Sequence, residues 1–195
     1  MIKPLIILSQ PKSGTYLCSE IVKNLGYTQS YLHLSEDDYT RYDPNNIIEG
    51  RHNPNKFKIK QPLSVSAALI LPGSFAVGHL SMNKHTVECF NNFTKIVLTR
   101  NEQERAESWN NFFNGEIRPK QSFVSGQRKA SQVSAWLEVE NIFHLDFSHM
   151  ISKNTEVIDM LQEHILGEVK HNSMEILETS LQAETLTKSN KRRQS

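Results

Sequence analysis

The sequence predicts an α/β protein in which a central parallel sheet lies between two layers of helices. Short apolar runs, such as those at 5–8 and 95–99, alternate with segments whose apolar residues recur at helical spacing. Parallel strands buried on both faces are typically continuous apolar runs, and strands that alternate with helices are typical of crossover connections. The chain has 195 residues, and we expect 1–195 to form one domain of this architecture.

The first elements follow from apolar runs and their stop signals. Residues 5–8 are predicted to form a buried strand, because this short apolar run ends abruptly at polar residues. Residues 14–25 have helical apolar spacing and are followed by Gly26, a typical helix stop. A second strand is expected at 30–34. The polar stretch at 35–60 contains Asp-Pro and Asn-Pro turn signals, which favour a long loop serving as a lid or acceptor-site excursion.

The alternation continues through the rest of the chain. Further strands are expected at 75–78, 95–99 and 142–147, and further helices at 64–71, 83–93, 102–113, 127–139 and 155–166. Residues 115–126 contain Gly, Pro and Ser and are predicted to form a loop. The pattern weakens beyond residue 170, and we expect residues 183–195 to form a flexible basic tail.

Charge and cysteine content exclude several classes of protein. The formal net charge is only +1, which argues against a nucleic-acid-binding protein and requires any anion site to be local. The spacing of Cys18 and Cys89 does not match a metal-binding motif. Cys18 lies on a predicted apolar helix face, which suits a buried free thiol in a reducing compartment. The first apolar run is too short for a signal or membrane-spanning segment. We therefore expect a cytoplasmic protein without a membrane partner.

The loop after the first strand contains residue types that suit a bound anion. In a parallel sheet, ligands bind beyond the carboxyl ends of the strands, where loop and helix N–H groups converge. Gly14 removes a Cβ that would block close approach, Ser13 and Thr15 add hydroxyl groups, and Lys12 adds a positive charge. The alternative is a loop whose hydroxyl group merely caps the helix. The kinase pattern G-x-x-x-x-G-K-[ST] is not met, because Lys12 precedes Gly14.

The stretch "QPKSGTYL" resembles the 5′-phosphosulfate loop of the PAPS-dependent sulfotransferases, which is usually written P-K-S-G-T-T-W. Residues 11–15 match this motif, whereas Tyr16 and Leu17 depart from it. The resemblance implies a P-loop-like sulfotransferase fold. It also implies that the donor-binding residues of the loop are Pro11, Lys12, Ser13, Gly14, Thr15 and Tyr16.

Two further segments carry the same resemblance. In "KIVLTRNEQERAESWNNFF", Arg100 is followed eight residues later by Ser108, as in the family's 3′-phosphate site, where an Arg fork suits a phosphate. In "FAVGHLSMN", His79 stands where the family has its catalytic base. Taken alone, each residue is more often structural or exposed. The resemblance covers roughly residues 4–167, and the basic tail matches the family's R-K-G segment poorly.

The resemblance implies transfer of a sulfuryl group from PAPS to a hydroxyl or amine of a small-molecule or glycan acceptor. His79 would accept the acceptor proton, since a base with a pKa near neutrality suits this task. Lys12 would stabilise the charge that grows on the bridging oxygen, and no metal is expected. Two alternatives remain open: a nucleotide-dependent kinase, and a non-catalytic protein that keeps the sulfotransferase fold and binds a partner.

Overall fold

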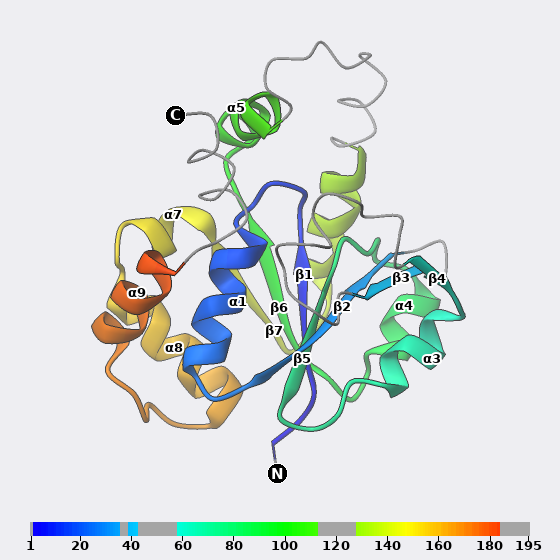
Figure 1. Ribbon diagram of the computed structural model, residues 1–195, viewed down its shortest axis with the longest axis horizontal. Coiled ribbons are helices and arrows are strands. Elements are labelled where there is room, and N and C mark those ends of the chain that lie inside the picture. Colours follow the sequence, from blue (N-terminus) through cyan, green and yellow to red (C-terminus); the bar gives the residue numbers. More distant parts are fainter. Residues whose placement is uncertain (1, 36–38, 43–57, 113–127, 184–195) are drawn as a thin grey trace.

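The computed structural model of the protein describes residues 2–35, 39–42, 58–112 and 128–183 (Figure 1). Its strands are β1 (Leu5–Ser9), β2 (Thr28–Leu34), β3 (Tyr39–Tyr42), β4 (Lys58–Lys60), β5 (Ser74–Gly78), β6 (Thr94–Thr99) and β7 (Ile142–Asp146). Its helices are α1 (Thr15–Asn24), α3 (Leu63–Ala68), α4 (Lys84–Cys89), α5 (Glu102–Phe112), η1 (Ala135–Glu138), α7 (Phe147–Ile151), α8 (Thr155–Leu166) and α9 (Ser173–Gln182). Residues 128–134 are also helical.

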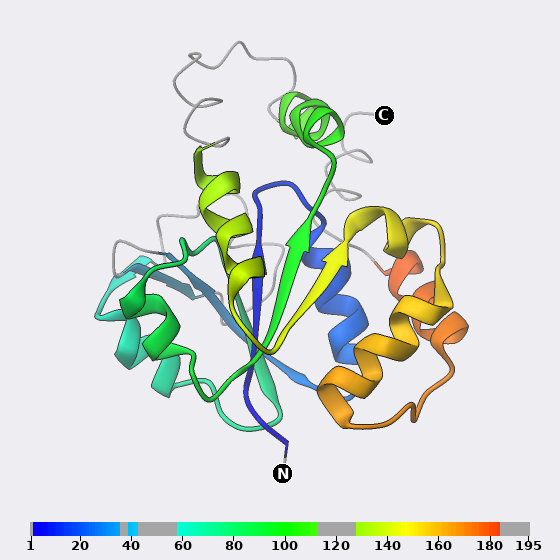
Figure 2. The ribbon, with the colours of Figure 1, turned by 180° about the vertical axis from the view of Figure 1, so that it is seen from behind.

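The strands form one sheet in the order β4-β3-β2-β5-β1-β6-β7. The five strands from β2 to β7 in this order are parallel, whereas β3 and β4 are antiparallel additions at one edge. Helices α1, α8 and α9 cover one face, and α3, α4 and the helical segment at 128–138 lie over the other (Figures 1 and 2). The predicted three-layer α/β fold with a central parallel sheet is therefore confirmed.

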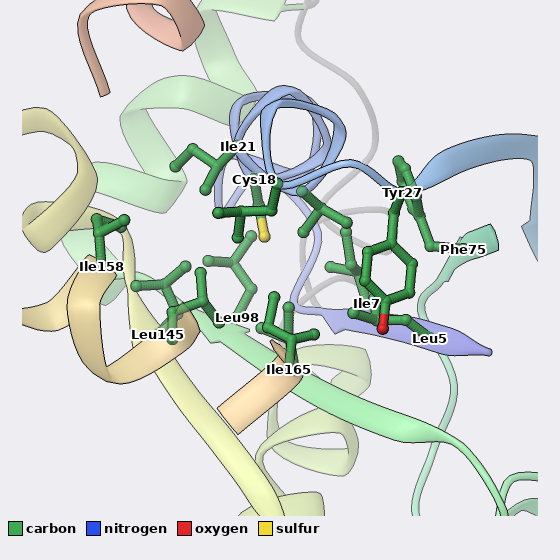
Figure 3. Packing of buried hydrophobic residues seen from close by; sticks show 14 of the residues in the cluster. Leu5, Ile7, Cys18, Ile21, Tyr27, Phe75, Leu98, Leu145, Ile158 and Ile165 are labelled. Atoms are coloured by element: carbon green, nitrogen blue, oxygen red, sulfur yellow. The ribbon is translucent and has the colours of Figure 1, made fainter. Parts of the chain in front are cut away.

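Alternate residues of the central strands supply the two cores. Leu5 and Ile7 of β1 belong to one buried cluster with Cys18 and Ile21 of α1, Leu98 and other residues of the first core (Figure 3). Their neighbours in β1 face the opposite core, as the period of a strand requires. Burial raises the pKa of the Cys18 thiol to about 12, so the thiol stays protonated inside this core.

The second core contains the largest fully buried side chain, Trp136 of η1. A buried indole N–H needs an acceptor, and Trp136 Nε1 donates to the carbonyl oxygen of Leu80 at 2.9 Å. This bond ties the segment after β5 to the helical segment at 128–138.

Three segments differ from the sequence-based expectations. The stretch at 35–60, predicted to be a loop, contains β3 and β4. Strands pair through backbone hydrogen bonds, which polar residues make as well as apolar ones. Helix α9 was not predicted, yet Ile176 and Leu177 are buried in the first core. The predicted loop at 115–126 and nearly all of the predicted tail at 183–195 lie outside the described residues.

Most other boundaries agree to within a few residues, and α8 agrees at both ends. Strand β7 ends one residue earlier than predicted, because the Asp146 side chain accepts from Ser148 N and so caps α7. Among the described residues, no helix is both long and apolar enough to cross a membrane.

A buried glutamine fixes the turn between α8 and α9. The Gln162 side chain is fully buried, and its Oε1 accepts from Lys170 N at 3.1 Å and His171 N at 2.8 Å. Its Nε2 donates to Ser173 Oγ at 2.8 Å and to the His171 carbonyl at 3.0 Å. All the hydrogen-bonding capacity of this side chain is thus used to hold the chain as it returns to the first core.

We expect Gln162→Leu to lower the free energy of unfolding by about 2 kcal/mol, because four hydrogen bonds of a fully buried side chain are lost together. Met160→Leu is a matched control on the same helix, where the side chain is 58% exposed and a change within about 0.5 kcal/mol is expected. Urea unfolding measures both. Equal losses for the two variants would contradict the structural role of Gln162.

Candidate functional site

The loop at 10–14 leaves the carboxyl end of β1 with a tight backbone. Lys12 and Gly14 have φ values of 68° and 87°, in the left-handed region, and Ser13 N donates to the Gln10 carbonyl at 3.2 Å. Gly14 occupies the N-cap position of α1 and has no side chain to cap the helix. The arrangement therefore leaves the amino end of α1 directed at the loop, as an anion site requires.

Two polar groups of this loop are removed from water. Burial lowers the pKa of Lys12 from 10.5 to about 7. Ser13 is fully buried, and its Oγ has no hydrogen-bond partner among the described residues. Buried polar groups normally have partners. A bound anion would satisfy the Ser13 hydroxyl and would favour the charged form of Lys12.

Arg100 connects the loop to the end of β6. Its Nη1 donates to the Lys12 carbonyl at 3.3 Å, and its backbone N donates to Gln10 Oε1 at 3.3 Å. Its Nε pairs with Glu104 Oε2 of α5 at 3.1 Å, and its guanidinium carbon lies 4.1 Å from the centre of the Phe147 ring. The two sequence motifs that were expected to bind one nucleotide thus meet at the carboxyl edge of the sheet.

Phe147 also explains the need for glycine in the loop. A Cβ added to Gly14 would lie 2.4 Å from Phe147 Cδ2, so the ring fills the space that a side chain would take. The same ring stacks on Arg100. The sequence analysis assigned this glycine to phosphate approach alone, whereas the structure also shows a packing requirement.

His79 follows β5 and lies beside the end of β1. Its Nδ1 is 2.6 Å from the Ser9 carbonyl oxygen and 3.1 Å from Ser9 Oγ, and Thr15 Oγ1 donates to Ser9 Oγ at 2.8 Å. The ring centres of His79 and His33 are 4.9 Å apart, in an edge-to-face arrangement. His79 is thus held beside the loop that contains Lys12.

The remaining predicted residues lie on the same elements. Pro11 is buried, Tyr16 is partly buried in the first turn of α1, and Ser108 is partly buried on α5, eight residues after Arg100. Among the described residues, no hydrogen bond joins Ser108 to the loop or to Arg100.

Four residues of this site were not predicted from the sequence: Ser9, Gln10, His33 and Phe147. Gln10 Oε1 accepts from Arg100 N, and its Nε2 donates to Ser134 Oγ at 2.8 Å, so it links the loop to the helix at 128–134. His33 reaches His79 because β2 shifts register between Gln29 and His33. Ser9 and Gln10 directly precede Pro11, and this position is the sequence feature that could have indicated their place in the site.

Comparison with known proteins identifies the fold. No family model and no curated protein matches the chain. Mouse sulfotransferase SULT7A1 complexed with PAP is similar in structure, with a TM-score of 0.57, 12% identity and 91% of this chain covered. The chain has the sulfotransferase fold.

A second solved sulfotransferase-fold structure agrees with the first. It is retinol dehydratase in complex with androsterone and the inactive cofactor PAP, with a TM-score of 0.55, 14% identity and 90% of this chain covered. The chain spans 63% of the length of each of these two proteins. At such low identity the likeness establishes the fold alone, so the activity has to be argued from the site.

We expect Gly14→Ala to be more destabilising than Gly26→Ala. Both positions have left-handed φ values, 87° and 91°, so both substitutions incur backbone strain of about 1–2 kcal/mol. A Cβ at Gly26 has no atom within 4 Å, whereas a Cβ at Gly14 overlaps Phe147, and overpacking adds about 1–3 kcal/mol. Urea unfolding compares the variants. Phe147→Ala should relieve the extra loss at residue 14, and additive effects would argue against this overlap.

We expect Lys12→Met to stabilise the protein at about pH 6 and to have little effect at about pH 10.5. The pKa of Lys12 is about 7 in the folded protein against 10.5 ordinarily. The unfolded chain therefore binds more protons between these values, and wild-type stability rises with pH across this window. Methionine has no charge and removes this dependence. Lys84→Met is the control, since the Lys84 side chain is 90% exposed. A gain that does not vary with pH would contradict the burial of a Lys12 charge.

Proposed function

We propose that the protein binds PAPS and transfers its sulfuryl group to a hydroxyl or amine of a small-molecule or glycan acceptor. The observation that carries this proposal is the 3.3 Å contact between Arg100 Nη1 and the Lys12 carbonyl. It brings a loop suited to a 5′-phosphosulfate and an arginine suited to a 3′-phosphate to one edge of a sulfotransferase fold. The two similar structures were solved with PAP.

The loop residues fit the sulfated end of such a donor. Ser13 offers a buried hydroxyl without a partner among the described residues, and Gly14 leaves the start of α1 without a side-chain cap. Lys12 is partly buried, so its attraction for an anion is less weakened by water than at the surface. These groups would hold the 5′-phosphosulfate.

Arg100 and Ser108 would hold the 3′-phosphate. The Glu104 partner of Arg100 has a side chain that is 47% exposed, and such exposed pairs contribute little. A phosphate can therefore replace the Glu104 carboxylate at modest cost and gain a charge-assisted pair with the guanidinium.

His79 and Lys12 are the residues of this chain that would take part in the reaction. When bound, PAPS supplies a sulfuryl group on a phosphate leaving group. His79 would accept the proton that the acceptor hydroxyl or amine loses as it attacks. Protonated Lys12 and the N–H groups at the start of α1 would stabilise the negative charge of the departing phosphate.

The second candidate is a non-catalytic protein that keeps the sulfotransferase fold and binds a nucleotide or a partner. Such a protein would keep the donor site and would not depend on His79.

Nucleotide binding tests the donor site. We expect adenosine 3′,5′-bisphosphate to raise the melting temperature by several degrees at about 100 times its Kd, because a ligand that binds only the folded state stabilises it by about 2.7 kcal/mol. Arg100→Ala should abolish the rise, whereas Arg128→Ala, an exposed arginine on another helix, should keep it. No shift at millimolar nucleotide would refute the proposal, and a larger shift with ATP and Mg²⁺ would favour a kinase.

Turnover of PAPS with a panel of alcohols, phenols, amines and sugars tests the reaction. We expect His79→Gln to lower kcat by about 10²- to 10⁴-fold, as the loss of a general base does. The thermal shift with adenosine 3′,5′-bisphosphate should persist in this variant. A shift without turnover by the wild type across the panel would support the non-catalytic candidate.

A further inference from the structure

A hydrogen-bonded path joins the loop to His79. Thr15 Oγ1 donates to Ser9 Oγ at 2.8 Å, and Ser9 Oγ lies 3.1 Å from His79 Nδ1. The Ser9 carbonyl oxygen is nearer still, 2.6 Å from the same nitrogen. One serine therefore offers two oxygens to a single ring nitrogen, and its hydroxyl is shared with the first residue of α1.

These contacts fix which ring nitrogen of His79 carries the proton. A carbonyl oxygen can only accept, so at 2.6 Å the Nδ1 atom must be the donor. In the neutral imidazole the other nitrogen, Nε2, then holds the lone pair. The base of the proposed reaction is thus Nε2, because Nδ1 faces the end of β1.

The surroundings of Ser9 make this arrangement rigid. Ser9 is fully buried and pairs with Leu98 of β6 in the sheet register. Thr15 is 7% exposed, and its carbonyl accepts from Ser19 Oγ at 2.8 Å one turn along α1. His33 packs edge-to-face on His79 from the neighbouring strand. The His79 ring is therefore supported from β1, α1 and β2.

We propose that Ser9 is a positioning residue that holds His79 in the Nδ1–H tautomer, and that the Thr15 hydroxyl supports Ser9 instead of binding the donor. The catalytic part of this inference rests on the proposed function, whereas the tautomer does not. The Thr15 hydroxyl donates its proton to Ser9 Oγ, so this proton is already engaged and is not offered to a donor phosphate. The Thr15 hydroxyl, which the sequence predicted to bind phosphate, would therefore support the base His79 instead.

The tautomer is measurable in the free protein by NMR of ¹⁵N-labelled histidine at about pH 8, with the His79 signals assigned from His79→Gln. We expect Nδ1 to have the ¹⁵N chemical shift of a protonated ring nitrogen and Nε2 to have that of an unprotonated one. Ser9→Ala and Thr15→Val should move the Nδ1 signal, whereas Thr15→Ser should leave it in place. An Nε2–H tautomer in the wild type, or signals unchanged by Ser9→Ala, would overturn the proposal.

Kinetics separate a positioning role from donor binding. We expect Ser9→Ala and Thr15→Val each to lower kcat by about tenfold while the KM for PAPS changes less than about threefold, and Thr15→Ser to restore kcat. A tenfold rise in KM with unchanged kcat in Thr15→Val would instead assign its hydroxyl to the donor and overturn this part. If adenosine 3′,5′-bisphosphate does not bind at all, the proposed function fails, and the NMR result still decides the tautomer and the role of Ser9.

Discussion

The contact between the Arg100 guanidinium and the Lys12 carbonyl is the interaction on which the site depends. The loop after β1 and the turn after β6 are 88 residues apart in sequence, and the sheet register brings their strands side by side. Because a carbonyl accepts without neutralising the guanidinium, the contact orients Arg100 and leaves its positive charge in place. Stacking on Phe147 adds about 0.5–2 kcal/mol without supplying a counter-charge. The counter-charge of Arg100 among the described residues is thus the Glu104 carboxylate, which is 47% exposed and which a phosphate can replace.

The same site places positive charge where burial makes it costly. Lys12 lies in a loop that lowers its pKa to about 7, and the neighbouring Ser13 hydroxyl has no partner among the described residues. Both features reduce the stability of the folded chain and both are relieved by an anion. A site that is costly when empty is typical of binding and catalytic centres, where local rules of stability are broken for function. Electrostatics and packing thus point to the same loop as the sequence motif.

The fold was predictable from the sequence because its buried strands are continuous apolar runs and its helices end at recognisable stops such as Gly167. The antiparallel strands β3 and β4 were not, since these short segments of largely polar residues carry no clear apolar periodicity. In the site, the loop and Arg100 stand in recognisable motifs. His33 does not, because its contact with His79 depends on an irregularity in β2, where Tyr31 adopts a φ of 60° that favours glycine or asparagine.

Gly14 is required at its position in the loop for more than one physical reason. Its left-handed φ begins α1, and the missing Cβ leaves the space that Phe147 occupies. Phe147 in turn stacks on Arg100, which holds the Lys12 carbonyl. A side chain at residue 14 would thus act on the loop directly and on the arginine through the aromatic ring. The glycine sets the relative positions of the loop and Arg100, and this geometric demand exists before any ligand approaches the loop.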